Sequence, residues 1–204
     1  MRFVLFDLDD TLIATLEASF AAWAAAAGPA APDRAEFVAG YRSLTFPECV
    51  ARWLGPVDVE EFAAAYRAAV VYRPIGDVPG LVAALRERGI GAGIVTNSTG
   101  PEAARKLAAA GIDAGAFAFV VGRPEDGSRM PVKDLGRILG DRGVDPATAV
   151  HLSDNPVDLA PSVAAGLPFR GVLTGAWARA DFTAAGLDPA DVHADVHAAT
   201  WDLR

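Results

Sequence analysis

Short apolar segments alternate with longer helix-like segments along most of the chain. The apolar segments have strand length, lean toward β-forming residues and are predicted to be strands. They cover residues 3–6, 91–95, 117–121, 149–152 and 169–173. Segments rich in alanine and leucine, each followed by a glycine that can end a helix, are predicted to be helices near residues 79–88, 101–110, 133–142 and 157–165. This alternation predicts an α/β fold, with a parallel sheet and helices on both of its faces.

Residues 14–71 follow a different pattern. Their apolar positions recur at helical spacing and none of their segments has a strand pattern. Proline and glycine separate four predicted helices, at residues 17–27, 33–41, 46–54 and 59–71. We therefore predict two domains: a core that contains the sheet, formed by residues 1–13 and 77–204, and an all-helical insertion formed by residues 14–76.

Composition and charge narrow the classes of function. The 204 residues are 52% hydrophobic and 22% charged, as in an ordinary folded protein. The net charge of −8 disfavours nucleic acid and anionic membranes as partners, because both favour a basic protein face. A single cysteine, Cys49, allows neither a disulfide framework nor a cysteine-based zinc site. No apolar run approaches the ~20 residues that span a bilayer, and an acid at Asp7 comes too early for a secretory signal, which predicts a cytoplasmic protein.

An acidic cluster follows the first predicted strand. Asp7, Asp9 and Asp10 lie within four positions, directly after residues 3–6. Carboxylates crowded at one strand end repel one another unless a cation is held there. Mg²⁺ suits such a place, because it favours oxygen ligands and often keeps waters and a substrate phosphate. The motif therefore predicts a metal site and a candidate nucleophile.

Polar residues also follow two other predicted strands. Thr96, Asn97 and Ser98 follow the second strand, and residues 153–158 (Ser-Asp-Asn-Pro-Val-Asp) follow the fourth. Ligands of an open parallel sheet bind beyond the carboxyl ends of its strands. Carboxylates, a hydroxyl and the ammonium of Lys133 at one such rim are groups suited to phosphoryl transfer through Mg²⁺.

With these motifs in this order, the chain resembles the phosphatase branch of the haloacid dehalogenase superfamily. The resemblance rests on residues 7–12 (Asp-Leu-Asp-Asp-Thr-Leu), residues 95–98 (Val-Thr-Asn-Ser), a basic segment within residues 122–133, and residues 153–158. It extends over nearly the whole chain. It implies a Rossmann-like parallel sheet core with an inserted all-helical cap domain, which that superfamily calls a type 1 cap. It also implies Mg²⁺ as the cofactor.

The resemblance implies a role for each residue of the site. Asp7 would attack phosphorus and form an aspartyl-phosphate. Asp9 would act first as a general acid and then as a general base. The ligands of Mg²⁺ would be Asp7, the main-chain carbonyl of Asp9, and Asp154. Thr96 would hydrogen-bond a phosphoryl oxygen, and Asp158 would support the metal ligands from outside or orient the basic residue.

The family pattern includes one basic residue at the active site, and two residues of this chain could fill that position. A literal match to the Gly-Lys-Pro of many family members places Arg123 there, whereas Lys133 opens the helix that leads to the second acidic motif. The chain has two lysines against sixteen arginines, and a compact ammonium suits a site that neutralises a carboxylate and a phosphoryl oxygen together. Both arguments favour Lys133. The candidates for binding the substrate are then Asn97, Arg123, Arg129 and Arg42.

The sequence therefore predicts a Mg²⁺-dependent phosphohydrolase of a small phosphorylated metabolite, since a cap that closes over the site excludes bulk water and large substrates. A phosphomutase would use the same chemistry, and the acid at Asp9 disfavours a hydrolytic dehalogenase. Two alternatives stay open: a non-catalytic protein that binds a phosphorylated ligand or a protein, and a phosphatase of a protein or nucleic-acid end. The presence of every motif argues against the first. The acidic balance and the cap argue against the second, while the loop at residues 123–129, which begins and ends with arginine, favours it.

Overall fold

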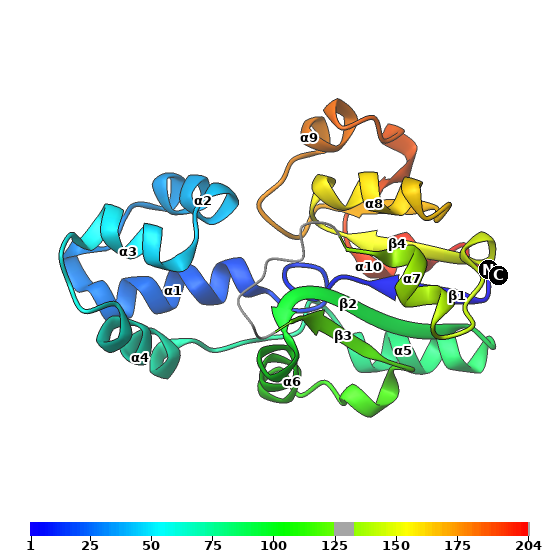
Figure 1. Ribbon diagram of the computed structural model, residues 1–204, viewed down its shortest axis with the longest axis horizontal. Coiled ribbons are helices and arrows are strands. Elements are labelled where there is room, and N and C mark those ends of the chain that lie inside the picture. The colour runs from blue at the N-terminus through cyan, green and yellow to red at the C-terminus, as the bar shows by residue number, and fades with distance from the viewer. Residues whose placement is uncertain (125–132, 204) are drawn as a thin grey trace. The chain divides into compact units, whose positions relative to one another are not determined.

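The computed structural model describes residues 1–124 and 133–203. The chain divides into two compact units (Figure 1). The larger comprises Met1–Ala14 and Pro74–Arg204, and the smaller comprises Thr15–Arg73. Within the described ranges, no helix combines the length and the apolar character needed to cross a membrane.

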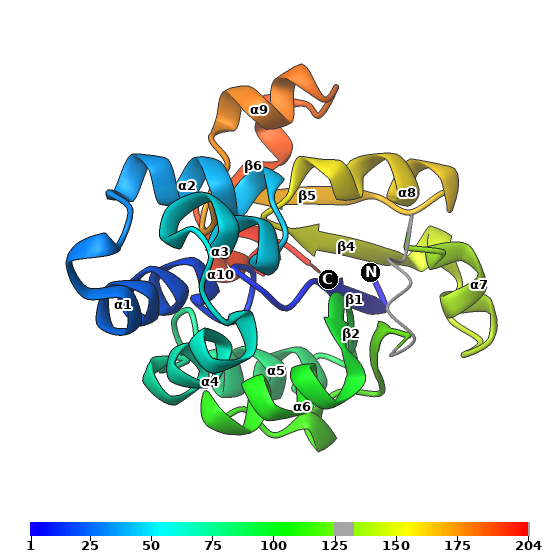
Figure 2. The ribbon, with the colours of Figure 1, turned by 60° about the vertical axis from the view of Figure 1, so that its left-hand side comes forward.

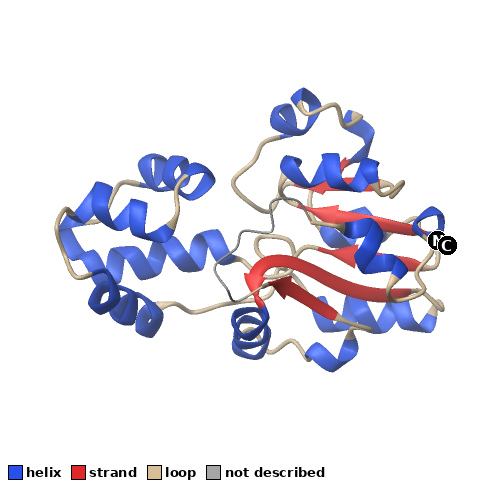
Figure 3. Ribbon diagram, viewed as in Figure 1, coloured by secondary structure: helices blue, strands red, loops and turns tan. Residues whose placement is uncertain are grey.

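A six-stranded parallel sheet forms the centre of the larger unit (Figures 1 and 3). Its strand order is β3-β2-β1-β4-β5-β6, and all neighbouring strands are parallel. The strands are β1 Phe3–Phe6, β2 Gly91–Thr99, β3 Val120–Arg123, β4 Ala149–Ser153, β5 Phe169–Val172 and β6 Val192–His193. The chain runs outward from β1 to β3 and then returns to the other side of β1 at β4. The strand order therefore reverses between β1 and β4, the position at which open parallel sheets bind ligands.

The central strands are buried along their whole length. All four residues of β1 and all five of β4 are buried, as expected for the central strands of a parallel sheet covered on both faces. The predicted α/β fold with a parallel sheet is confirmed. The bounds differ in places: β2 extends to Thr99, β3 lies at Val120–Arg123 instead of 117–121, and β4 and β5 each differ by one residue at their ends. Strand β6 was not predicted. With two residues, β6 is too short to show a strand pattern in the sequence.

Helices cover both faces of this sheet. They are α5 Val78–Glu87, α6 Gly100–Ala109, α7 Leu135–Gly140, α8 Leu159–Ala164, α9 Arg179–Ala184 and α10 Val196–Thr200. In Figure 1, α7 and α8 lie in front of the sheet, and α5 and α10 lie behind it. Helix α7 places Leu135, Ile138 and Leu139 in one buried cluster with Phe3 and Leu5 of β1. This packing fixes the chain that leads from Lys133 into α7 close to the central strand.

The smaller unit is built from helices, which Figure 2 shows, and its core is aromatic. Its α-helices are α1 Thr15–Ala27, α2 Arg34–Ser43, α3 Phe46–Leu54 and α4 Val59–Ala69. Trp23 of α1 is 3% exposed, and its ring contacts aromatic rings of the other three helices. These rings belong to Phe37, Phe46, Trp53, Phe62 and Tyr66. Asp33 and Asp58 cap α2 and α4 by accepting main-chain N–H groups of the first turn.

Candidate active site

A tight turn follows β1 and carries the first acidic motif. Asp10 has a φ of 56°, the one positive φ at a residue other than glycine within residues 1–124 and 133–203. This conformation costs roughly 1–2 kcal/mol for most residues, and aspartate is among those that tolerate it. The turn is held by hydrogen bonds from Asp10 N–H to the Ile13 carbonyl at 2.7 Å and from Leu12 N–H to the Leu8 carbonyl at 3.0 Å. It keeps the acids of the motif at the carboxyl end of β1.

Lys133 joins the first acidic motif to the second. Its Nζ donates to Asp7 Oδ1 at 2.7 Å and to Asp158 Oδ2 at 2.6 Å. Ser153, the last residue of β4, donates its hydroxyl to the same Asp158 oxygen at 2.7 Å. Lys133 is 4% exposed and the two acids are similarly buried, so this chain of charges is shielded from solvent.

Burial and the shared ammonium set the protonation of this chain. Burial is the largest influence on Asp7 and raises the pKa of its carboxyl to about 6, although Lys133 acts in the opposite direction. Burial also opposes the charges of Lys133 and Asp158, but their attraction outweighs it. The two acids raise the pKa of Lys133, and Lys133 lowers the pKa of Asp158. The ammonium of Lys133 therefore pairs with both carboxylates. It compensates the negative charge of Asp158 more fully than that of Asp7.

Thr11 connects the turn to Asp154. Its hydroxyl accepts the Asp154 main-chain N–H at 3.0 Å and donates to Asp154 Oδ1 at 3.3 Å. Thr11 is fully buried and Asp154 is 7% exposed. The loop after β5 contacts the same turn, because Thr174 donates its hydroxyl to the main-chain carbonyl of Asp10. The ends of β1, β4 and β5 are thus tied together around Asp154.

The oxygens near Asp7 fit a hard dication. Burial, followed by repulsion from Asp7 and Asp10, raises the pKa of Asp154 well above its usual range. Such an excess of buried negative charge is relieved by a bound cation. No three acidic, histidine or cysteine side chains form a metal-binding group in the described part of the chain, so a site here needs a main-chain donor such as the predicted Asp9 carbonyl. Gly175 lies so close to Asp154 that a Cβ at this position would collide with the carboxylate.

The carboxylate of Asp9 lies in a different cluster, beside α6. Lys106 Nζ donates to Asp9 Oδ1 at 2.7 Å and to Ser98 Oγ at 2.9 Å, and Ser98 Oγ donates to Asp9 Oδ2 at 2.8 Å. Lys106 was not predicted from the sequence. Two signals mark it: it is one of only two lysines, and it occupies the buried face of an amphipathic helix.

The predicted phosphate-binding residues lie at the carboxyl end of β2. Thr96 is fully buried, and its hydroxyl accepts the Ser98 main-chain N–H at 3.1 Å. Asn97 follows with an exposed side chain. The register between β2 and β3 shifts between Val95 and Thr99, so the strand is irregular where these polar residues lie.

The predicted basic residues are dispersed. Lys133 contacts Asp7, whereas Arg123 is the half-buried last residue of β3. Arg42 lies in the last turn of α2, within the helical unit. Arg129 lies outside the described residues.

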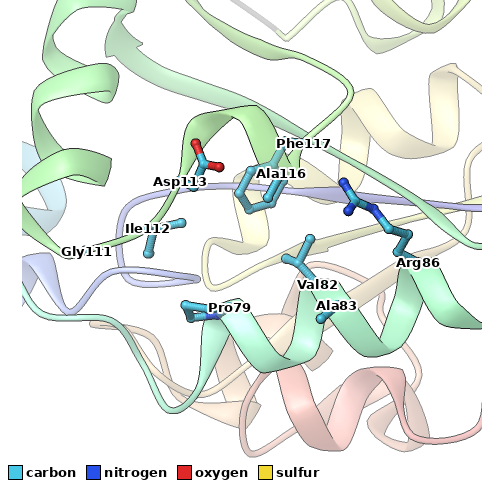
Figure 4. Close-up of a pocket in the computed structure, with 9 residues that line it drawn as sticks. All are labelled: Pro79, Val82, Ala83, Arg86, Gly111, Ile112, Asp113, Ala116 and Phe117. Atoms are coloured by element: carbon cyan, nitrogen blue, oxygen red, sulfur yellow. The ribbon is translucent and has the colours of Figure 1, made fainter.

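A hollow elsewhere on the larger unit contains none of these residues (Figure 4). It lies between α5 and the segment that joins α6 to β3, and has a volume of about 180 Å³. Most of its lining is apolar, and Arg86 and Asp113 are its charged residues. Without the acids and lysines described above, it is not the place where we locate the chemistry.

The larger unit is thus an open parallel α/β sheet with acids gathered where the strand order reverses. A family model described as haloacid dehalogenase-like hydrolase matches residues 4–172. The chain therefore belongs to the haloacid dehalogenase-like hydrolase family, as its motifs predicted.

Solved structures show the same fold. A candidate phosphatase from Clostridium difficile has a TM-score of 0.79 at 18% identity, covering 100% of this chain and 98% of that chain. A candidate β-phosphoglucomutase from Thermotoga maritima has a TM-score of 0.75 at 17% identity, covering 98% of both chains. A predicted phosphoglycolate phosphatase from Haemophilus somnus has a TM-score of 0.72 at 18% identity, covering 98% of this chain and 96% of that chain. At these identities the likeness establishes the fold alone. A comparison with curated protein sequences found no match.

Proposed function

We propose that the protein is a Mg²⁺-dependent phosphohydrolase that acts on a small phosphorylated metabolite through an aspartyl-phosphate. The observation that carries this proposal is the buried chain of Asp7, Lys133 and Asp158 at the carboxyl end of β1. It holds a carboxylate in a fixed orientation beside a neutralising ammonium. A carboxylate that attacks an anionic phosphoryl group needs both features.

Asp7 is the nucleophile in this proposal. With a pKa of about 6, its carboxyl is mostly ionised at neutral pH. Its attack forms a bond to phosphorus while the bond from phosphorus to the ester oxygen breaks, which yields an aspartyl-phosphate and an alcohol. Lys133 reduces the repulsion between the two anions during their approach.

Asp9 is the proposed acid and base. It gives a proton to the departing ester oxygen and then takes a proton from the water that attacks phosphorus. This second step breaks the bond between phosphorus and Asp7 and releases inorganic phosphate. Thr96 and Asn97 are the proposed partners of the phosphoryl oxygens, because both lie at the carboxyl end of β2, next to β1.

The proposed ligands of Mg²⁺ are Asp7, Asp154 and the main-chain carbonyl of Asp9. The raised pKa values of the two carboxyls support this assignment, because a cation between them would favour their ionised forms. When bound, Mg²⁺ would offset negative charge on the phosphoryl group. Thr11 contributes by holding Asp154 at both its main chain and its carboxylate.

We assign residues 1–13 and 77–204 as the catalytic core and residues 14–76 as the cap. The names of two structural neighbours, a phosphoglycolate phosphatase and a β-phosphoglucomutase, support a small phosphorylated metabolite as the substrate class. Arg123, Arg129 and Arg42 are the proposed partners of a further anionic group on such a substrate.

Release of phosphate from p-nitrophenyl phosphate and from a panel of metabolite phosphates tests the proposal. We expect turnover with Mg²⁺, none with EDTA, and none in Asp7→Asn. Asp141→Asn is the matched control, because it removes the same charge from a residue whose side chain is 57% exposed. A folded protein that turns over none of these compounds, or an Asp7→Asn variant as active as the unaltered protein, contradicts the proposal.

A further inference from the structure

The two lysines of the chain are both buried, and each binds one acid of the first motif. Lys133 binds Asp7 and Lys106 binds Asp9, both at 2.7 Å. All other basic side chains, apart from three histidines, are arginines. The proposed function uses Lys133 and leaves Lys106 without a role.

Lys106 and Ser98 form a closed ring of hydrogen bonds with the Asp9 carboxylate. Lys106 binds one oxygen of Asp9 and Ser98 binds the other, while Lys106 also donates to Ser98. Glu102, one turn earlier on α6, lies 3.3 Å from the same ammonium. The ammonium therefore donates to Asp9 and Ser98 and forms a further ion pair with Glu102, an arrangement that suits the compact head of lysine better than the planar fork of arginine.

Fold stability alone does not account for this lysine. The Lys106 side chain is 6% exposed and lies on the buried face of α6. Burying an ammonium is strongly unfavourable unless it is paired, and replacing a buried ion pair with apolar residues is often neutral or stabilising. The contribution of Lys106 is to orient the Asp9 carboxylate. With a donor on each oxygen, the Asp9 carboxylate is fixed against rotation, and an ammonium partner binds its ionised form.

We propose that Lys106, together with Ser98, is a positioning residue that holds the Asp9 carboxylate in place to activate water during breakdown of the aspartyl-phosphate. This inference rests on the proposed function. In the step concerned, the water oxygen bonds to phosphorus, a water proton passes to Asp9, and the bond between phosphorus and Asp7 breaks. A carboxylate has about four lone-pair sites, so it can accept from several donors at once, a water among them.

The test follows p-nitrophenyl phosphate turnover by stopped flow. p-Nitrophenolate leaves readily without a proton, so this substrate separates formation of the aspartyl-phosphate from its breakdown. Lys106→Met should lower kcat roughly 10- to 100-fold, the scale expected when a reacting group is misplaced. It should leave a rapid burst of p-nitrophenolate that approaches one equivalent per protein molecule, because the aspartyl-phosphate accumulates. Arg105→Met is the matched control, because it removes a positive charge from the adjacent exposed position of α6 and should leave kcat and burst unchanged.

A second arm separates a positioning role from a general structural one. In an Asp9→Asn background, Lys106→Met should cause no further loss of rate, because its effect passes through Asp9. Ser98→Ala should show a smaller loss of the same kind, and it carries the test if Lys106→Met does not fold. An unchanged kcat, a burst that falls together with kcat, or the same loss in the Asp9→Asn background overturns the inference while the proposed function stands. An unaltered protein with neither burst nor turnover overturns the proposed function, and the inference with it.

Discussion

Replacing Asp7 with asparagine should stabilise the metal-free protein while it abolishes turnover. Lys133 lies between two buried carboxylates, so the three groups carry one excess negative charge. Asparagine removes that excess and leaves the pair of Lys133 and Asp158 balanced. The same carboxylate that makes the proposed nucleophile therefore lowers the free energy of unfolding when no cation is bound.

The magnitude follows from the pKa of Asp7. Burial raises it from 3.8 to about 6, and each pKa unit corresponds to about 1.4 kcal/mol. The ionised Asp7 therefore costs about 3 kcal/mol of stability. The folded protein binds the proton of the Asp7 carboxyl more tightly than the unfolded chain does. The loss in free energy of unfolding is therefore absent below about pH 4, grows as the pH rises, and is complete above about pH 7. Asp7→Asn should thus exceed the unaltered protein in stability by about 3 kcal/mol near pH 8, and the difference should vanish near pH 4.

Urea unfolding of both proteins in EDTA, followed by tryptophan fluorescence over this pH range, measures the difference. Acids common to both proteins cancel in the comparison. Added Mg²⁺ should narrow the gap, because the cation stabilises the folded form that retains the carboxylate. Asp141→Asn should stay within about 0.5 kcal/mol of the unaltered protein. An Asp7→Asn variant less stable than the unaltered protein near pH 8 without metal, or a gap that does not change with pH, refutes the reasoning.

Two further substitutions test the surroundings of the site. Lys133→Met should lower the free energy of unfolding by about 3–5 kcal/mol, because it leaves two buried acids without their cation; urea unfolding that shows almost no change would contradict the buried ion-pair chain. Gly175→Ala should weaken Mg²⁺ binding roughly 10- to 100-fold in calorimetric titration, because its Cβ displaces the Asp154 carboxylate. Gly140→Ala, where a Cβ meets no other group, is the control, and equal affinities in the two variants would contradict the assignment.

The centre of the sheet was predictable from the sequence, whereas its edges were not. Strand β1 has the predicted bounds, and β4 differs by one residue, because both are short, mainly apolar runs that are buried along their whole length. Strand β2 continues through Thr96–Thr99, polar residues that indicate a turn when the sequence is considered alone. Its pairing with β3 is interrupted after Val95 and resumes only at Thr99 with Arg123, a long-range contact that the local sequence does not encode. Strand β6 pairs over only two residues, so no periodic pattern could mark it.

Of the two lysines near the acidic motif, Lys133 was predicted from the sequence and Lys106 was not. Lys133 was predicted because it opens the helix that the sequence predicts ahead of a recognised motif, and its rarity made it conspicuous. Lys106 is equally rare but lies in the middle of a helix, eight residues beyond Ser98, where a lysine is usually a solvent-exposed residue. Its spacing nevertheless placed it on the buried face with Ala103 and Leu107. A charged residue at such a position requires an acceptor within reach, so the pattern indicates a buried acid even before the structure identifies that acid as Asp9.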